Sequence, residues 1–290
     1  MTGWRFALSK RWAGYFALTA VFAVVCALLG QWQFDRRAQA QAEIARIDAN
    51  YDSAPLDVRQ ALVHLSDFTA SQRWLPVSLT GTYLTEKQQL VRNRPYNGRP
   101  GFEVLTPLLL PSGEVFIVDR GWISTGSKQD APDLVPEAPP GQVVVVARLK
   151  AGEPLLDARR TVVGSGQIPT INLPQLEALV DRPTYTGAYG LLASESVSSA
   201  VVPAPSLRPI RDEGPHLSYA LQWYVFALLS FIGLGWALRQ EYRSVNADDP
   251  EERERADDRM KRRAERTKRA PSDSETEDEI LDRNQTEFSR

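Results

Sequence analysis

The sequence predicts a membrane protein in which two transmembrane helices flank a mostly antiparallel, β-rich (α+β) external domain. Two observations predict the helices: no charged residue occurs for 23 positions between Arg11 and Asp35, or for 25 positions between Glu213 and Arg239. A third predicts the domain, because the stretch 35–216 contains several short segments rich in β-branched and aromatic residues. The average composition, 43% hydrophobic and 24% charged, conceals this division.

Each uncharged segment is long enough to cross the apolar core of a bilayer, which takes about 20 helical residues. The first segment follows Arg5, Lys10 and Arg11, as a signal peptide would, but no small-x-small cleavage site directly follows Leu29. We therefore expect an uncleaved helix over residues 12–34. The second helix is expected over 217–238, with Trp and Tyr near its ends. These two helices exclude a purely soluble protein.

The arginines around the second helix predict the orientation. Four arginines follow this helix and two closely precede it: Arg239, Arg243, Arg253 and Arg255 after it, and Arg208 and Arg211 before it. Because cytoplasmic loops carry the excess of Lys and Arg, residues 1–11 and 239–290 are expected in the cytoplasm and the domain 35–216 outside. Only eleven residues precede the first helix, too few for a mitochondrial transit peptide, so we expect a multi-pass protein of a bacterial plasma membrane.

The residue inventory excludes several classes of function. Cys26 is the one cysteine and only two histidines occur, which excludes an intramolecular disulfide and argues against a four-ligand zinc site. The formal net charge of -2 gives no general attraction for nucleic acid, so we expect no nucleic-acid partner. The sequence has no GxSxG, phosphate-loop or HExxH motif, and we expect no enzyme and no catalytic residue.

The external domain is expected to hold six or seven short strands. Strands are predicted at residues 75–84, 88–94, 102–110, 115–124, 143–150 and 184–193. The step 111–113, Pro-Ser-Gly, predicts a hairpin turn, since Pro fixes φ and Gly permits a positive φ. Residues 173–180 predict one short helix with Pro in its first turn, and residues 38–48 predict a helical continuation of the first membrane helix.

The stretch 239–290 has 13 basic and 16 acidic residues in 52 positions and almost no large apolar ones. Such a segment buries too little apolar surface to offset the entropy of ordering the chain. We expect it to be a disordered, solvated tail. Its basic run 261–269 is followed by an acidic run at 272–279, so the two signs nearly cancel.

Four patterns stand in order along the chain. They are LGQWQFDRR at 29–37, VSLTGTY at 77–83, a stretch at 92–122 with Gly-Phe, Thr-Pro-Leu and Arg-Gly-Trp landmarks, and HLSYALQWYVF at 216–226. Together with the two-helix topology, they resemble the surfeit locus protein one family, membrane factors for the assembly of cytochrome c oxidase. One departure is Asp119, where the family pattern has Asn before Arg-Gly-Trp.

The resemblance implies assistance in maturing the catalytic subunit of the oxidase, including the handling or insertion of haem a. It implies haem a as a transient cofactor, and as partners the catalytic subunit, haem a synthase and membrane lipid. The residues add a hypothetical site: His216, Tyr219 and Trp223 fall at helical spacing, and an imidazole is a good axial ligand for haem iron. Arg36 and Arg37 are candidates to pair with the haem propionates.

Each of these residues also has a structural interpretation. Trp223 and the other interfacial aromatics are commonly membrane anchors, and Arg36 and Arg37 are commonly flanking charges. In the domain, five residues are candidates for either structure or docking: Gly81, Gly101, Arg120, Gly121 and Trp122. For Arg120 the sequence leaves a buried structural partner and a docking residue equally open.

Three classes of function therefore stay open. The first is a non-enzymatic assembly chaperone for the oxidase. The second is a membrane-tethered scaffold or sensor whose domain binds another extracytoplasmic partner. The third is an external enzyme of unrecognised type, against which the scarcity of His and Cys weighs.

Overall fold

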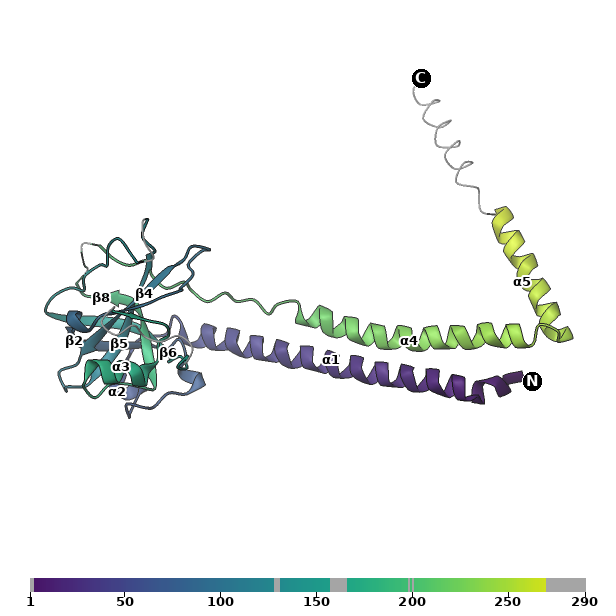
Figure 1. The fold of residues 1–290 in the computed structure, drawn as a ribbon, viewed down its shortest axis with the longest axis horizontal. Coiled ribbons are helices and arrows are strands. Elements are labelled where there is room, and N and C mark those ends of the chain that lie inside the picture. Colours follow the sequence, from purple (N-terminus) through teal and green to yellow (C-terminus); the bar gives the residue numbers. More distant parts are fainter. Residues whose placement is uncertain (1–2, 128–130, 157–165, 198, 200, 270–290) are drawn as a thin grey trace, which may run out of the picture. The chain divides into compact units, whose positions relative to one another are not determined.

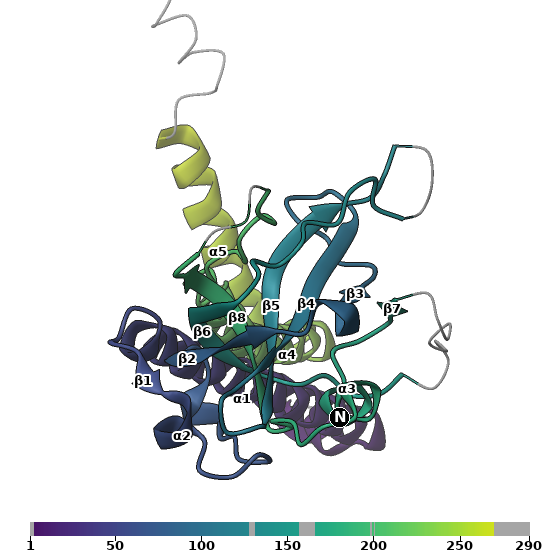
Figure 2. The ribbon, with the colours of Figure 1, turned by 90° about the vertical axis from the view of Figure 1, so that its left-hand side faces the viewer.

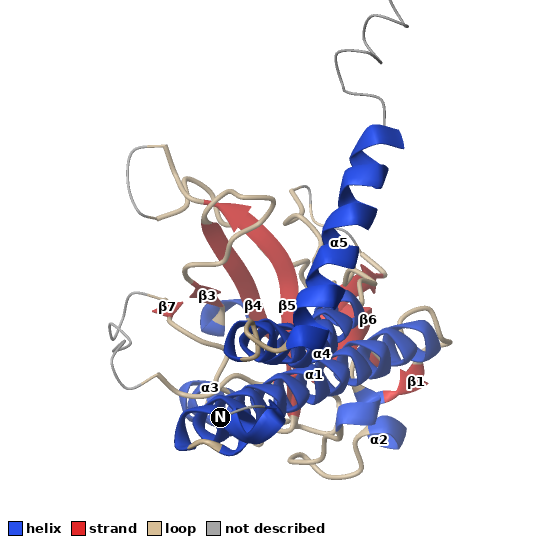
Figure 3. Ribbon diagram, turned by 90° about the vertical axis from the view of Figure 1, so that its right-hand side faces the viewer, coloured by secondary structure: helices blue, strands red, loops and turns tan. Residues whose placement is uncertain are grey.

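The computed structural model describes residues 3–127, 131–156, 166–197, 199 and 201–269. The chain divides into two compact units, a helical unit of Met1–Arg37 with Pro215–Arg290 and a β domain of Ala38–Gly214. Figure 3 shows how helix and strand are distributed along the chain. The long helices and the strands follow the order that the sequence predicts, helix, β-rich segment, helix.

The helical unit contains a short 3-10 helix, η1 (Gly3–Leu8), then α1 (Lys10–Asn50), α4 (His216–Val245) and α5 (Pro250–Arg269). Both α1 and α4 are long and apolar enough to span a membrane. Their large apolar side chains are exposed, for example Leu18 and Leu228, at 68% and 60%. A surface of this kind is stable in lipid rather than in water. The protein is thus a membrane protein with two transmembrane helices flanking a strand-rich domain.

Within the helical unit, α1 and α4 lie side by side and antiparallel (Figure 1). Contacts at both ends fix this direction: His216, at the start of α4, meets Gln33, and Glu241, near its end, pairs with Arg11. The start of α1 and the end of α4 therefore lie at the same end of the helix pair. The 41 residues of α1 would extend about 60 Å, twice the thickness of the bilayer core. The predicted helical continuation over residues 38–48 is confirmed, and these last turns belong to the β domain.

The β domain is built on one eight-stranded, mostly antiparallel sheet with the order β1-β2-β6-β8-β5-β4-β3-β7. Figure 2 shows its central strands side by side. The strands are β1 (Leu56–Asp57), β2 (Pro76–Tyr83), β3 (Gln89–Val91), β4 (Gly101–Leu109), β5 (Val115–Ser124), β6 (Gln142–Ala151), β7 (Gln167–Ile168) and β8 (Ala188–Glu195). A further pairing of β2 with β4, through Thr82↔Leu109 and Tyr83↔Leu108, closes the five central strands into a ring. The sheet is therefore barrel-like.

Short helices complete the domain. These are α2 (Val58–Ala61), α3 (Leu173–Val180) and the 3-10 turns η2 (Ala70–Gln72) and η3 (Thr85–Lys87). The side chain of Asn172 caps α3 by accepting the N–H of Gln175 at 3.1 Å, Pro174 stands in the first turn, and Asp181 ends the helix in the left-handed conformation. The predicted helix at 173–180 is confirmed because all three signals are local.

The two larger apolar cores lie on opposite faces of the sheet, and a smaller one joins Leu90, Phe102, Val104 and Ile123. Alternate residues of β6, Val143, Val145, Ala147 and Leu149, join Phe116 and Val118 of β5 in one core with α2. The other core joins Val115 and Ile117 of β5 to α3 and to Ile47, near the end of α1. Strand β5 is thus buried on both faces, which explains its nearly continuous apolar sequence.

Three predicted features differ in the structure. The last strand runs over Ala188–Glu195 rather than 184–193, because Thr184 makes only an isolated bridge with Val115. Strands β1 and β7, two residues each, were not predicted. The stretch from 239, expected to be disordered, continues α4 to Val245 and forms α5, where Arg255 pairs with Glu251 at i,i+4. Residues 270–290 lie outside the described part of the chain.

Candidate functional site

Small residues bring α1 and α4 together. Cys26 and Gly30 of α1 and Ala220 of α4 are buried between the helices. A Cβ atom on Gly30 would lie 2.7 Å from Cε2 of Tyr224, so the Tyr224 ring can occupy this position because residue 30 is glycine. The Tyr224 ring also lies 6.3 Å from the Phe34 ring, centroid to centroid. The contact places the start of α4 beside the segment 30–37 of α1.

His216, the first residue of α4, lies at this junction. It is half-buried, and its Nδ1 lies 2.9 Å from Oε1 of Gln33. With the proton on Nδ1, the imidazole donates to the amide oxygen of Gln33, and the lone pair of Nε2 is left to accept a bond. A histidine that ligates a metal usually donates its other ring N–H to a carboxylate, a backbone carbonyl or water, and the amide oxygen of Gln33 can accept in the same way.

Arg36 and Arg37 follow Gln33 by three and four positions, so they lie one turn further along the same side of α1. Arg36 is exposed and Arg37 is half-buried, and both interact with other groups of the protein. The structure thus brings both arginines to within about one helical turn of the level of His216.

The two predicted aromatic residues of α4 separate in the structure. Residues that are buried or half-buried recur on one side of the helix, at His216, Ala220, Trp223, Ala227 and Ser230. Trp223 belongs to this side and packs edge-on against Phe226, with ring centroids 5.9 Å apart. Tyr219 is 49% exposed and does not belong to it. Gln33, to which the sequence assigned no role, is the residue that contacts His216, although it stands inside the Gly-x-Trp-Gln motif.

In the β domain, Arg120 is a buried residue rather than an exposed docking group. Its side chain has no exposed surface, and Nη1 donates to the carbonyl of Pro136 at 3.2 Å while Nη2 donates to Oγ of Ser199 at 3.1 Å. Nη2 also lies 3.8 Å from Oε1 of Glu195, an ion pair that is too long for a hydrogen bond. The guanidinium carbon lies 5.6 Å from the centre of the Tyr83 ring.

Gly81, Gly101, Gly121 and Trp122 occupy tightly packed positions of the same sheet. A Cβ on Gly81 would lie 2.5 Å from the carbonyl oxygen of Leu109, and one on Gly101 would lie 2.3 Å from that of Ile123. Gly121 has a φ of +127°. Trp122 stacks on Tyr96, with centroids 5.0 Å apart, and donates its indole N–H to the carbonyl of Arg94 at 2.8 Å. Each of these residues has a packing role.

A buried group of ionisable side chains lies beside Gly121. Oδ1 of the fully buried Asp119 accepts the N–H of Gly121 at 3.0 Å. Burial, and then the nearby Glu103 carboxylate, raise the pKa of Asp119 well above its usual value. Burial also raises the pKa of Glu103, although Arg94, whose Nε lies 2.9 Å from Oε2 of Glu103, acts in the opposite direction. A protonated Asp119 is close in shape and polarity to the asparagine of the family pattern.

We expect Asp119→Asn to stabilise the protein at high pH. The raised pKa means that the folded state keeps a proton that the unfolded state releases, so wild-type stability falls as the pH rises above the usual aspartate value. Asparagine has no proton to release at this position, so the variant does not lose stability in this way as the pH rises. Its melting temperature should exceed that of wild type by roughly 3 °C or more at pH 8, about 1 kcal/mol in a domain of this size, and the gap should shrink towards pH 4.

Thermal unfolding of the detergent-solubilised chain across this pH range makes the measurement. Asp52→Asn is the matched control, because Asp52 is exposed and pairs with Arg208. A gap that stays constant with pH would show that Asp119 does not hold the proton.

Comparison with known proteins decides the family. A model of the SURF1 family matches residues 20–228, which include most of α1, the β domain and the first part of α4. The chain belongs to the SURF1 family. An uncharacterized SURF1-like protein of Mycobacterium tuberculosis is 30% identical over 242 residues, 82% of this chain and 88% of the relative. A SURF1-like protein of Monosiga brevicollis is 26% identical over 253 residues, 77% of this chain and 87% of the relative.

One SURF1 relative has a name that states a role. The cytochrome oxidase assembly protein SHY1 of Saccharomyces cerevisiae is 28% identical over 111 residues, 38% of this chain and 28% of the yeast protein. In the part of the chain that the structure describes, no group of three or more His, Cys, Asp and Glu side chains is placed to hold a metal ion.

Proposed function

We propose that this SURF1 protein is a non-enzymatic assembly factor for cytochrome c oxidase, which holds haem a transiently for the catalytic subunit. The assembly role is supported by membership of the SURF1 family and by the name of the yeast relative. Association with the oxidase complex follows from that role. Haem a synthase is a proposed further partner, since it makes the group to be handled.

The observation that carries the haem part of the proposal is the contact between His216 and Gln33. An imidazole that ligates iron must present a lone pair, and its other ring N–H almost always donates to a neighbouring acceptor, which fixes the ring and the tautomer. Gln33, 2.9 Å from Nδ1, can hold the tautomer that leaves Nε2 available. Arg36 and Arg37 carry the charge that pairs with propionates, and the exposed apolar surface of α4 suits a macrocycle. The chemistry of this donor set fits a haem.

In the proposed role each residue has a separate task. Haem a, when bound, would supply an iron that takes an imidazole ligand and a macrocycle that partitions into lipid. His216 would ligate the iron, Gln33 would position His216, and Arg36 and Arg37 would pair with the propionates.

The test is the optical spectrum of the full chain purified from cells that make haem a. We expect a Soret band that His216→Ala abolishes or shifts, because loss of the axial ligand changes both spin state and affinity. Gln33→Ala should weaken binding by about 10- to 100-fold, as is usual for a residue that holds a ligating histidine. Arg36→Ala and Arg37→Ala should weaken binding without changing the shape of the spectrum.

The matched control is His64→Ala, which removes an exposed histidine of the β domain whose backbone N–H bonds to Asp67. An unaltered spectrum in His216→Ala protein would remove His216 as the ligand. If the wild-type chain carries no haem while its loss still reduces oxidase assembly, the protein is a membrane-tethered scaffold for the catalytic subunit instead.

We further propose that the protein lies in a bacterial plasma membrane with both termini in the cytoplasm. The antiparallel helices, with both ends of the unit together, support a common side for the termini, and Arg239 and Arg243 support the cytoplasmic side. Alkaline phosphatase fused after Ser53 should be active, and the same fusion after Val245 should be inactive. An inactive fusion after Ser53 with an active fusion after Val245 would show that the β domain lies in the cytoplasm and the termini lie outside.

A further inference from the structure

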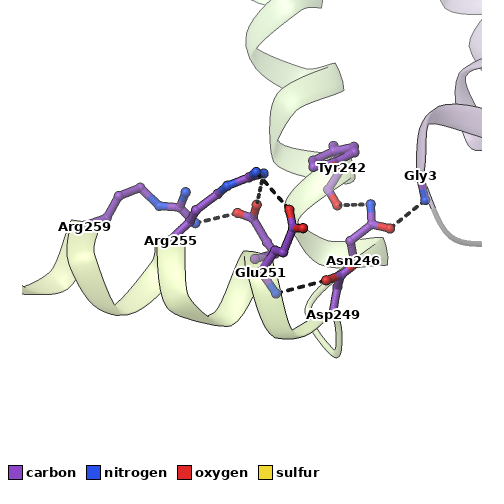
Figure 4. Close-up of polar contacts among 8 residues, drawn as sticks. Gly3, Tyr242, Asn246, Asp249, Glu251, Arg255 and Arg259 are labelled. Atoms are coloured by element: carbon purple, nitrogen blue, oxygen red, sulfur yellow. Dashed lines mark hydrogen bonds and ion pairs between the residues drawn. The ribbon is translucent and has the colours of Figure 1, made fainter.

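At the far end of the helical unit from His216, the start of the chain is held against the end of α4. The N–H of Gly3 donates to Oδ1 of Asn246 at 2.7 Å, and Nδ2 of Asn246 donates to the carbonyl of Tyr242 at 2.8 Å (Figure 4). The Trp4 ring stacks on the Tyr242 ring, with centroids 4.5 Å apart. These contacts fix the indole of Trp4 beside the last turns of α4.

The start of α5 is fixed at the same place. Asp249 caps it by accepting the N–H of Glu251 at 3.0 Å (Figure 4). The side chain of Glu252 is only 8% exposed and pairs with Arg259 at 2.6 Å and with Arg255 at 3.8 Å. The hydrogen bond from Arg259 lowers the pKa of Glu252. The glutamate holds two arginines of α5 towards α4.

The three segments line an open basic pocket of about 440 Å³. Its lining consists of Trp4, Gly235, Arg239, Tyr242, Arg243, Glu252, Arg255 and Arg259. Four guanidinium groups face one carboxylate, and that carboxylate is already paired with Arg255 and Arg259. Arg239 and Arg243, one turn apart on α4, form no ion pair of 4.0 Å or less with a carboxylate of the described residues. The pocket has room and charge for an anion.

We propose that this pocket binds the headgroup phosphate of an anionic phospholipid in the leaflet at which the two termini lie. Arginine binds phosphate oxygens in a bidentate manner, and Trp and Tyr favour the boundary between lipid and water. The pocket begins where the apolar part of α4 ends, and Ile232, Gly235 and Arg239 share one side of the helix. The exposed Ile232 and Trp236 give acyl chains a path along α4.

The position of the pocket favours a lipid over a free phosphate, which has the same oxygen chemistry but no acyl chains. Basic pockets beside transmembrane helices are typical sites for acidic lipid headgroups. The proposed site is independent of haem binding, because it lies at the opposite end of α1 and α4 from the contact between His216 and Gln33.

The test compares two double variants of the full chain purified in a neutral detergent. Arg239→Gln with Arg243→Gln removes two charges from the pocket. Lys261→Gln with Arg262→Gln removes two charges from exposed positions of α5 outside it. Binding of fluorescent short-chain phosphatidylglycerol, phosphatidylcholine and inorganic phosphate is measured for each, and thermal unfolding shows that each variant is folded.

We expect phosphatidylglycerol to bind wild type and the α5 variant within about twofold of each other. The pocket variant should bind roughly tenfold more weakly or worse, since each basic residue near an anionic headgroup contributes about fivefold. Phosphatidylcholine should bind weakly to all three. If both variants bound phosphatidylglycerol equally weakly, the binding would depend on general surface charge rather than on the pocket, and the proposal would be wrong. Inorganic phosphate that displaces the lipid at equal concentration would make it a free-anion site and overturn the proposal for a lipid.

Discussion

Gly81→Val is expected to prevent accumulation of the folded protein. Gly81 lies on β2, next to the two residue pairs, Thr82↔Leu109 and Tyr83↔Leu108, that join β2 to β4 and close the ring of strands. Its Cβ would lie 2.5 Å from the carbonyl oxygen of Leu109 and 2.9 Å from Cγ of Leu108. Since one obstacle is backbone, rotation of a side chain cannot relieve the clash, and β2 and β4 must separate.

Such a separation exposes buried backbone groups and loosens the core, which lowers the free energy of unfolding by about 3 kcal/mol or more. That is a large part of the roughly 5–15 kcal/mol that typically stabilises a protein, and it lowers abundance several-fold in cells. The matched control is Thr80→Val, which places the same side chain at the preceding, exposed position of β2. Immunoblots of membranes and thermal unfolding measure both. A Gly81→Val protein that accumulates and melts like the control, yet fails in oxidase assembly, would make this edge a docking surface.

The elements that the sequence predicted well are those with local causes. Strand β5 was predicted over its full length, because a run of apolar residues bounded by the turn at Gly113 is sufficient to define it. The same is true of α1 and α4, whose apolar lengths match a bilayer. By contrast, β1 and β7 exist only through parallel pairing with Val77 and Leu90, residues distant in sequence. The closure of the ring at Gly81 is likewise a long-range event, which periodicity does not report.

In the candidate site, too, the sequence predicted the features with local causes and missed those that depend on long-range contacts. The sequence placed His216 at the start of α4, because the apolar run begins there. It could not select Gln33 as the partner of His216, since that contact depends on the closeness that Gly30 permits. Helical spacing grouped Tyr219 with Trp223, whereas the rotation of α4 against α1 leaves Tyr219 outside the contact and brings in Tyr224. Spacing defines a face but not the direction in which it points.

The same limit applied to Arg120, which the sequence left between two roles and the structure buries. Its nearest carboxylate, Glu195 on β8, lies 75 positions further along the chain, and the side chain of Glu195 is 5% exposed. The hydroxyl of Tyr83 donates to the other oxygen of Glu195 at 3.2 Å. Burial, and then this glutamate, raise the pKa of Tyr83. Arg120, Glu195 and Tyr83 thus form one buried polar group that links β5, β8 and β2.

Arg120→Met should destabilise the β domain by about 3–5 kcal/mol, because it leaves the buried Glu195 without its counter-charge. In a domain of this size the melting temperature should fall by roughly 10 °C. Methionine keeps most of the apolar volume of the arginine stem, so the loss reports on charge rather than on a cavity.

The double variant Arg120→Met with Glu195→Gln tests that cause. A neutral amide in place of the stranded carboxylate removes most of the electrostatic cost, and the amide oxygen can still accept the hydroxyl proton of Tyr83. The double variant should therefore recover more than half of the lost stability. Thermal unfolding of the two single variants and the double variant gives the coupling energy directly. If the stability losses of the two single variants simply add in the double variant, the ion pair at 3.8 Å does not contribute to stability. Arg120 then stabilises the domain through Pro136 and Ser199 alone.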